Sequence, residues 1–182
     1  LWGGAMPVQL VAPRRIAGAP GGDFYVVDAT SGQLALLTPK GELKALFTVP
    51  GIALSIATCW GELLVATTEG LLYRVNAQGR VLGQFPLAGV RAAWPAGMTC
   101  DSVTGLLFIA ERDAGRVRAV RQDGTVALTL TQANADRLEA PVDVALDPVA
   151  RRLWVLLESY QNGSGLQLHG FALDGTWAAS AV

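Results

Sequence analysis

Short stretches that alternate apolar and polar residues run along almost the whole chain, and glycine-containing turns separate them. Alternation with a period of two is typical of β-strands with one buried face, and glycine adopts the positive φ that tight hairpin turns need. One short segment, residues 132–138, has a weak helical period instead. Apolar runs that end in an acidic or hydroxyl residue lie at residues 22–28, 61–67, 105–111 and 152–158. Tight glycine turns follow these runs at residues 39–42, 77–80, 122–125 and 173–176.

The apolar runs and the glycine turns each recur about every 40 to 50 residues. Each unit has room for four short strands, and that number of strands per repeat is typical of a propeller blade. We therefore predict one all-β domain, a β-propeller of about four four-stranded blades. A β-sandwich with coincidental spacing is the alternative, and the agreement of two separate features over four units disfavours it. The expected blades cover about residues 13–50, 51–90, 91–135 and 139–182.

The third unit, residues 97–120, resembles the NHL repeat. That repeat runs roughly Gly-Ile-Ala-Val-Asp, a glycine turn, Leu-Tyr-Val-Ala-Asp, a short polar loop and Arg-Ile-x-Val. The fourth unit keeps the pattern at residues 141–147, and the first keeps it at residues 24–28. The second departs from it, because Thr67 stands where the acid belongs. The resemblance covers about residues 13–182 and implies a propeller fold without specifying a function.

Four blades are fewer than NHL-like propellers commonly have, which is six and sometimes five. The chain therefore forms either a closed four-bladed ring or an open arc. Residues 8–13 are similar to residues 45–50, so we interpret residues 1–12 as the outer strand of a preceding blade. The fourth unit already has its own outer strand. We therefore expect an open arc rather than a closed four-bladed ring, and we interpret the chain, which starts at Leu1, as processed or as the ordered stretch of a longer one. Exposed end faces of an arc are usually interfaces.

Composition excludes several classes of function. The chain is 51% hydrophobic and 16% charged with a net charge of −1, so it is neither disordered nor strongly attractive to nucleic acid or anionic lipid. No apolar run approaches the length of a membrane span. Three arginines of one unit and one N-terminal tryptophan form a candidate interaction face, although acidic residues between the arginines disfavour the alternative of RNA binding. These residues are Arg112, Arg116, Arg118 and Trp2.

Catalytic candidates are few. His169 is the single histidine, so a site with two or three histidines cannot form within this chain. Asp28, Glu111 and Glu158 recur at equivalent positions, where related lactonase-like propellers hold a divalent cation in the channel. The simpler interpretation is that each acid accepts backbone N–H groups at the end of a strand. We predict no catalytic, cofactor-binding or metal-binding residue, and a protein that is not an enzyme.

Two further features bear on the compartment. Cys59 and Cys100 fall near the ends of equivalent inner strands of consecutive units, so a disulfide is one interpretation and two buried free thiols are the other. Asn162 begins an Asn-Gly-Ser sequence that fits an N-glycosylation site but is also a common turn. Together they favour, slightly, a secreted or lumenal protein.

The sequence as a whole favours a non-enzymatic propeller scaffold that acts in a larger assembly. Its expected partners are other protein subunits, or further blades of the same parent chain, with no cofactor. The alternatives are a propeller enzyme of the lactonase or lyase type with a cation in its channel, and a module that binds glycan or lipid.

Overall fold

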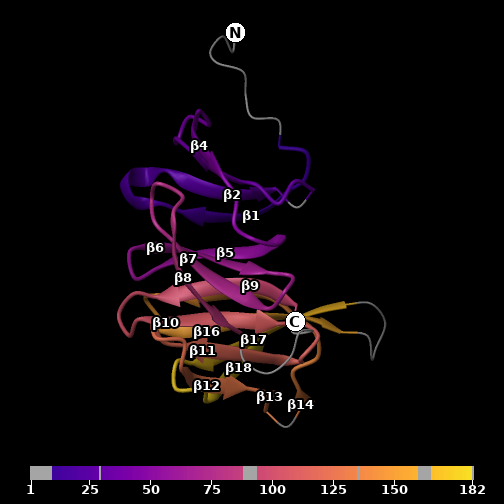
Figure 1. The fold of residues 1–182 in the computed structure, drawn as a ribbon. Helices are drawn as coiled ribbons and strands as arrows, with labels where there is room; N and C mark the ends of the chain where they lie inside the picture. Colours follow the sequence, from indigo (N-terminus) through magenta and orange to yellow (C-terminus); the bar gives the residue numbers. More distant parts are fainter. Residues whose placement is uncertain (1–9, 29, 88–93, 135, 160–164, 182) are drawn as a thin grey trace.

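A computed structural model describes residues 10–28, 30–87, 94–134, 136–159 and 165–181 of the chain. These residues form four four-stranded antiparallel sheets with the strands in sequence order, as predicted for propeller blades (Figure 1). One 3-10 turn, η1 (Pro20–Gly22), is the only helical element of the described chain. No helix among these residues is long and apolar enough to cross a membrane.

Each blade is a meander of four strands. Blade 1 contains β1 (Pro13–Gly18), β2 (Phe24–Asp28), β3 (Leu34–Leu37) and β4 (Leu43–Phe47). Blade 2 contains β5 (Ala53–Cys59), β6 (Glu62–Thr67), β7 (Leu71–Val75) and β8 (Val81–Pro86). Blade 3 contains β9 (Pro95–Asp101), β10 (Leu106–Glu111), β11 (Arg116–Val120) and β12 (Val126–Leu130). Blade 4 contains β15 (Pro141–Asp147), β16 (Arg152–Ser159), β17 (Gly165–Ala172) and β18 (Trp177–Ala181).

The connection between blades 3 and 4 is a small hairpin, made of β13 (Gln132–Ala133) and β14 (Asp136–Arg137). The prediction of a helical turn at residues 132–138 is therefore wrong. The local reason is Asn134, which has a φ of 58°. A left-handed residue interrupts a right-handed helix and suits a tight β-turn.

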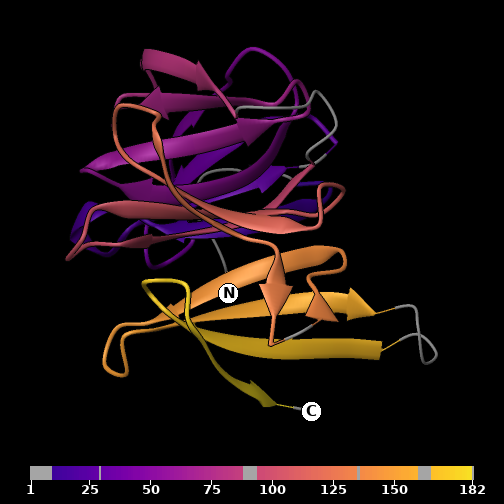
Figure 2. The ribbon, with the colours of Figure 1, turned by 90° about the horizontal axis from the view of Figure 1, so that it is seen from below.

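The blades follow one another around the inner strands. Strand β1 packs beside β5, β5 beside β9 and β9 beside β15, whereas β1 and β15 do not pack side by side in this way among the described residues. Seen from below, the fourth blade lies beside the third and away from the first two (Figure 2). The described blades therefore form an arc in which each blade packs on the next.

The core lies between the blades and follows from the alternating pattern. Tyr25 and Val27 of β2 pack in one cluster with Leu63 and Val65 of β6. The second strands of blades 2 and 3, and then of blades 3 and 4, meet in the same way. Full burial of one such side chain stabilises the fold by about 1.5–3 kcal/mol, so these clusters are the main source of stability.

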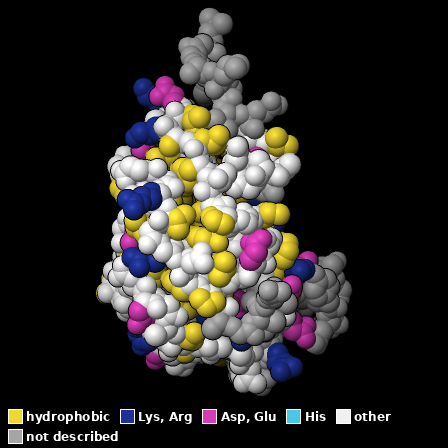
Figure 3. Space-filling view, in the orientation of Figure 1, with side chains coloured by type: hydrophobic (Ala, Val, Ile, Leu, Met, Phe, Trp, Pro, Cys, Tyr) yellow, Lys and Arg dark blue, Asp and Glu magenta, His cyan; other side chains and the backbone are white. Residues whose placement is uncertain are grey.

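Hydrophobic side chains also reach the surface. On the face in Figure 3 they lie in patches across the middle of the molecule, with charged side chains toward the margins. Singly exposed apolar side chains are normal in soluble proteins, and only contiguous patches indicate an interface. Large hydrophobic residues that are clearly exposed include Ile16, Leu43, Leu46, Leu82, Val103, Val149 and Leu166.

Candidate functional site at the rim between the blades

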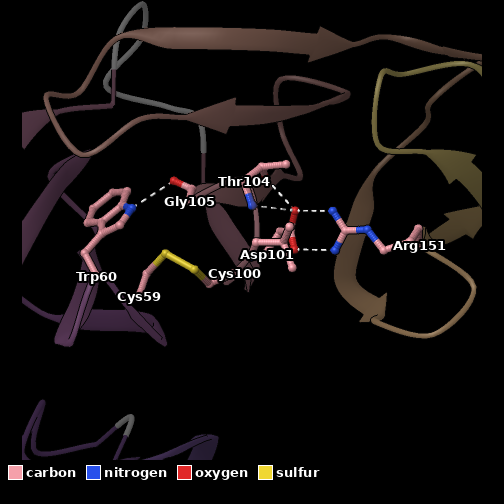
Figure 4. The surroundings of a disulfide bond; sticks show 8 residues. Cys59, Trp60, Cys100, Asp101, Thr104, Gly105 and Arg151 are labelled. Atoms are coloured by element: carbon pink, nitrogen blue, oxygen red, sulfur yellow. Dashed lines mark hydrogen bonds and ion pairs between the residues drawn. A yellow bond between two sulfur atoms is a disulfide. The ribbon is translucent and has the colours of Figure 1, made fainter.

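A disulfide joins blades 2 and 3 where their inner strands end (Figure 4). Cys59 is the last residue of β5, and Cys100 lies at the equivalent end of β9. Their Cα atoms are 5.5 Å apart, within the range that a disulfide spans. In this structure the two cysteines are paired, and neither is a free thiol. Because 41 residues separate them, the bond restricts the unfolded chain and stabilises the fold by about 2–4 kcal/mol.

Each cysteine has a neighbour in sequence that ties two blades together. Trp60 donates its indole N–H to the backbone carbonyl of Gly105 in blade 3, at 2.8 Å. Asp101 accepts two hydrogen bonds from the guanidinium of Arg151 in blade 4, at 2.6 and 2.7 Å. Figure 4 shows these contacts on either side of the disulfide. Blades 2, 3 and 4 are thus joined along one rim by a covalent bond, an ion pair and a hydrogen bond.

The carboxylate of Asp101 is buried, and its charge is compensated. Arg151 is the main reason that the pKa of Asp101 lies far below its usual range, and the Thr104 hydroxyl and backbone add to the effect. A buried carboxylate without such partners would favour its neutral form. The ion pair therefore keeps the Asp101 carboxylate charged and joins blade 3 to blade 4.

Trp60 adopts an unusual backbone conformation for a large residue. Its φ is 55°, and that of the next residue, Gly61, is 75°. Two successive left-handed residues form the two-residue hairpin turn that fits the twist of β-strands. A bulky residue in this region costs about 1–3 kcal/mol. The indole hydrogen bond to Gly105 helps to offset this cost and fixes the ring over the rim.

A cavity of about 590 Å³ lies beside the disulfide and Trp60, over blades 1 to 3. Pro20, Tyr25 and Leu63 contribute to its mostly apolar lining. Its one acidic side chain, Glu62, is held by Arg74 through two hydrogen bonds of 2.6 Å. Cavities of this size accept small molecules, and this one offers a neutral, apolar environment.

The space between the inner strands contains an arginine. The Arg15 guanidinium of β1 donates to the carbonyl of Ala96 in β9 at 2.9 and 2.5 Å, and to the carbonyl of Val142 in β15 at 3.2 Å. The Asp143 carboxylate lies 3.9 Å away. A positive charge of the chain itself therefore occupies the oxygen-rich region that a channel cation would need.

The recurrent carboxylates do not gather into one cluster. Asp28 accepts hydrogen bonds from four backbone N–H groups, two from residues before β1 and two from residues after β2, and they lower its pKa to about 2. Glu111 is buried and pairs with Arg116 and Arg118, whereas Glu158 pairs with Arg112 at 2.7 Å. Within the described ranges, no group of three histidine, cysteine or acidic residues is arranged to hold a metal ion. Asp28 thus acts as a strand-end cap.

The predicted interaction residues have different surroundings. Arg118 is only 3% exposed and forms an interior ion pair, so its guanidinium is not presented at the surface. Arg112 and Arg116 are half-buried. Trp2 and Asn162 lie outside the described residues. His169 lies on β17, where burial lowers its pKa.

The residues that join the blades were only partly evident from the sequence. Trp60 follows an inner strand and Arg151 precedes a second strand, so both stand in the same hairpin turn of their blades. That shared position is a signal in the repeat. The sequence does not show that both side chains reach toward blade 3, because the angle between blades sets that direction.

No family model and no curated protein matches the sequence. Among solved structures, hydrazine synthase from Kuenenia stuttgartiensis matches with a TM-score of 0.76 and 12% identity, over 100% of this chain and 52% of that one. A streptogramin B lyase matches with a TM-score of 0.73 and 17% identity, over 96% and 55%. Virginiamycin B lyase from Staphylococcus aureus matches with a TM-score of 0.74 and 14% identity, over 95% and 56%.

These likenesses show the propeller fold alone, because the identities are low. The chain spans about half the length of the chains that it matches. The resemblance to NHL repeats, which no family match tests, stays a prediction.

Proposed function

We propose that this protein is a non-enzymatic propeller scaffold, built of NHL-like repeats, that binds another protein through the outer face of blade 4. One observation carries the proposal. Trp154 and Leu156 of β16, with Leu168 of β17, lie on the side of the sheet that faces away from blade 3. These side chains are only half-buried, and the adjoining Leu166 is 65% exposed. A contiguous apolar sheet face of this kind is typical of an interface.

The rim contacts support a scaffold role because they make the arc rigid. A closed propeller fixes the angle between its blades by closing the ring, and an arc needs other constraints. The disulfide, the Trp60 hydrogen bond and the Asp101–Arg151 ion pair supply these between blades 2, 3 and 4. A rigid surface loses little conformational entropy when it binds. The disulfide also favours an oxidising compartment.

The alternative of a lyase-type enzyme has support in the names of two solved neighbours. One solved variant of virginiamycin B lyase, with a histidine replaced by alanine, is described as catalytically inactive. In this chain the single histidine, His169, belongs to blade 4, whereas the rim cavity lies over blades 1 to 3. Arg15 already occupies the region between the inner strands. Both observations favour the scaffold.

The test is protection of the face in the native particle. Hydroxyl-radical footprinting should label Trp154 and Leu168 strongly in the purified chain and weakly in the particle isolated from its native cell. Val149, which is 92% exposed in the turn between β15 and β16, is the control and should be labelled in both. Equal labelling of Trp154 in the two samples would contradict the scaffold proposal.

A further inference from the structure

We propose that the cavity beside the disulfide binds a small, uncharged aromatic molecule that carries a hydrogen-bond acceptor. A second cavity, of about 330 Å³, adjoins the cavity of about 590 Å³ described above, because four residues line both. These residues are Ala19, Pro20, Tyr25 and Ala77. We name the two compartments together the rim site. Each compartment has the volume of a small-molecule site.

The rim site is separate from the other surfaces considered above. Its lining includes residues of the turns that precede β2 and β6, whereas Asp28 is the last residue of β2 and lies at the opposite end of that strand. The rim site is therefore not the position of the recurrent carboxylates. Neither lining includes a described residue of blade 4, so ligand binding here is independent of the scaffold interface.

The hydroxyl group of Tyr25 is the observation that carries the proposal. Tyr25 is only 2% exposed, and it lines both compartments. Among the described residues its hydroxyl has no hydrogen-bond partner. Buried hydroxyl groups nearly always have a partner, because an unpaired one costs free energy. A ligand in the rim site would supply the missing hydrogen bond.

The surroundings of this hydroxyl favour its role as a donor. Burial raises the pKa of Tyr25, and the nearby Asp23 carboxylate adds to the effect. The phenol therefore stays protonated at neutral pH, and the carbonyl oxygen of a ligand is a matching acceptor. Thr58 and Ser102 also line the larger compartment, but both are more exposed than Tyr25, so solvent can satisfy their hydroxyl groups.

The charged side chains of the lining favour an uncharged ligand, because each is already paired. In the larger compartment Arg74 holds Glu62 through two hydrogen bonds of 2.6 Å. In the smaller compartment Lys44 donates to Asp23 at 2.6 Å. A charged ligand would lose hydration on entry and would find no unpaired counter-charge in the described lining.

The apolar part of the lining favours a planar ring. Trp60 and Tyr25 are aromatic, and Pro20 adds a flat apolar surface. The indole N–H of Trp60 already donates to Gly105, so the indole offers apolar surface rather than a donor. Figure 4 shows this ring next to the disulfide, which also lines the cavity and fixes its wall. Aromatic pairs attract each other beyond the effect of buried area.

The first test uses prodan, an uncharged naphthalene ketone whose emission shifts to shorter wavelength in apolar surroundings. The purified protein should bind one equivalent, with a saturable shift. Ala77→Trp, at an exposed turn residue that lines both compartments, should fill the site and reduce the affinity by about tenfold or more. Gln78→Trp, at the next exposed residue of the same turn and outside both linings, is the matched control and should leave the affinity unchanged.

A competition series tests the hydrogen bond of Tyr25. The competitors for prodan are 2-acetylnaphthalene, 2-ethylnaphthalene, which lacks the carbonyl group, and 2-naphthoate, which is charged and should compete least. The ratio of the affinities for the ketone and the ethyl compound should be about three- to tenfold larger in the wild type than in Tyr25→Phe, because the variant keeps the ring and loses only the donor. Circular dichroism confirms that each variant is folded.

The remaining outcomes overturn the proposal. An absence of saturable prodan binding would exclude the rim site and leave the scaffold proposal untouched. Binding that survives Ala77→Trp and is lost in Leu166→Glu would place the probe on the outer face of blade 4 instead. The same affinity ratio in the wild type and Tyr25→Phe would show that the hydroxyl does not bind the ligand.

Discussion

At the scale of single residues, the Asp101–Arg151 ion pair is the polar contact whose loss should matter most. Arg151→Ala leaves a buried carboxylate that has lost two charge-assisted hydrogen bonds. Such a loss costs about 1–3 kcal/mol, and we expect that decrease in the free energy of unfolding in urea titrations. Arg80→Ala, at an exposed turn, is the control and should change stability by less than about 0.5 kcal/mol. Equal effects of the two variants on the free energy of unfolding would contradict a stabilising ion pair between blades 3 and 4.

Asp28 should give the protein a defined sensitivity to acid. Backbone N–H groups lower its pKa to about 2 in the folded chain, whereas an unfolded aspartate titrates near pH 4. A lowered carboxyl pKa means that its stabilisation is complete above pH 4 and disappears as the pH falls toward 2. Asp28→Asn should therefore flatten the fall in the urea midpoint between pH 5 and pH 2. An equal fall in the wild type and the variant over this pH range would contradict a stabilising role of the Asp28 carboxylate.

At the scale of elements, the spacing of the inner strands depends on glycine at one position. A Cβ atom on Gly97 of β9 would lie 2.7 Å from the Cα atom of Asp143 in β15, and a backbone atom cannot rotate away. Overpacking of this kind costs about 1–3 kcal/mol, so Gly97→Ala should lower the thermal midpoint. Gly83→Ala, in a strand where the new atom meets nothing within 4 Å, should be neutral or slightly stabilising.

The disulfide between β5 and β9 makes a separate contribution. Removal of a bond that closes a 41-residue separation should lower the free energy of unfolding by about 2–4 kcal/mol. The double variant Cys59→Ser, Cys100→Ser should show this loss under oxidising conditions. The wild type should show it only after reduction, and alkylation with intact mass measurement confirms the redox state of each sample. A double variant as stable as the oxidised wild type would exclude a stabilising bond.

Strands and blades could be predicted from the sequence because both depend on local pattern. The alternation of Leu153, Val155 and Leu157 with more exposed neighbours places β16, and the glycine turns delimit the hairpins. The rim contacts were harder to predict. Arg151 reaches Asp101 across 50 residues, and Arg15 reaches Ala96 across 81. Such contacts depend on the angles between blades, which no local periodicity encodes. The misassigned segment at residues 132–138 lies between blades, where the repeat gives no guidance.

At the scale of the whole molecule, the interfaces between the blades differ from the outer face of blade 4. The three interfaces between the blades consist of buried apolar side chains in a repeated arrangement, whereas the outer face of blade 4 has the same construction without a neighbour among the described residues. The ring of Trp154 lies beside Gly170, with the guanidinium of Arg152 5.6 Å from the ring centroid. An arginine above an aromatic ring stabilises it at a water-exposed surface. This face is thus compatible with a chain that stays folded before its partner arrives.

A chain with such a face should bind an apolar dye without unfolding. We expect the purified protein to increase the fluorescence of anilinonaphthalene sulfonate at neutral pH, while its far-ultraviolet circular dichroism remains that of a β-protein. Leu166→Glu, at the exposed edge of the face, should reduce this fluorescence at least twofold, because a hydrated carboxylate removes apolar contact with the ring of the dye and repels its sulfonate. Leu82→Glu, at another exposed leucine on the outer strand of blade 2, is the control and should reduce it far less. If the two variants reduced the fluorescence equally, the dye would be reporting scattered apolar residues, and the outer face of blade 4 would not be the principal apolar surface of the molecule.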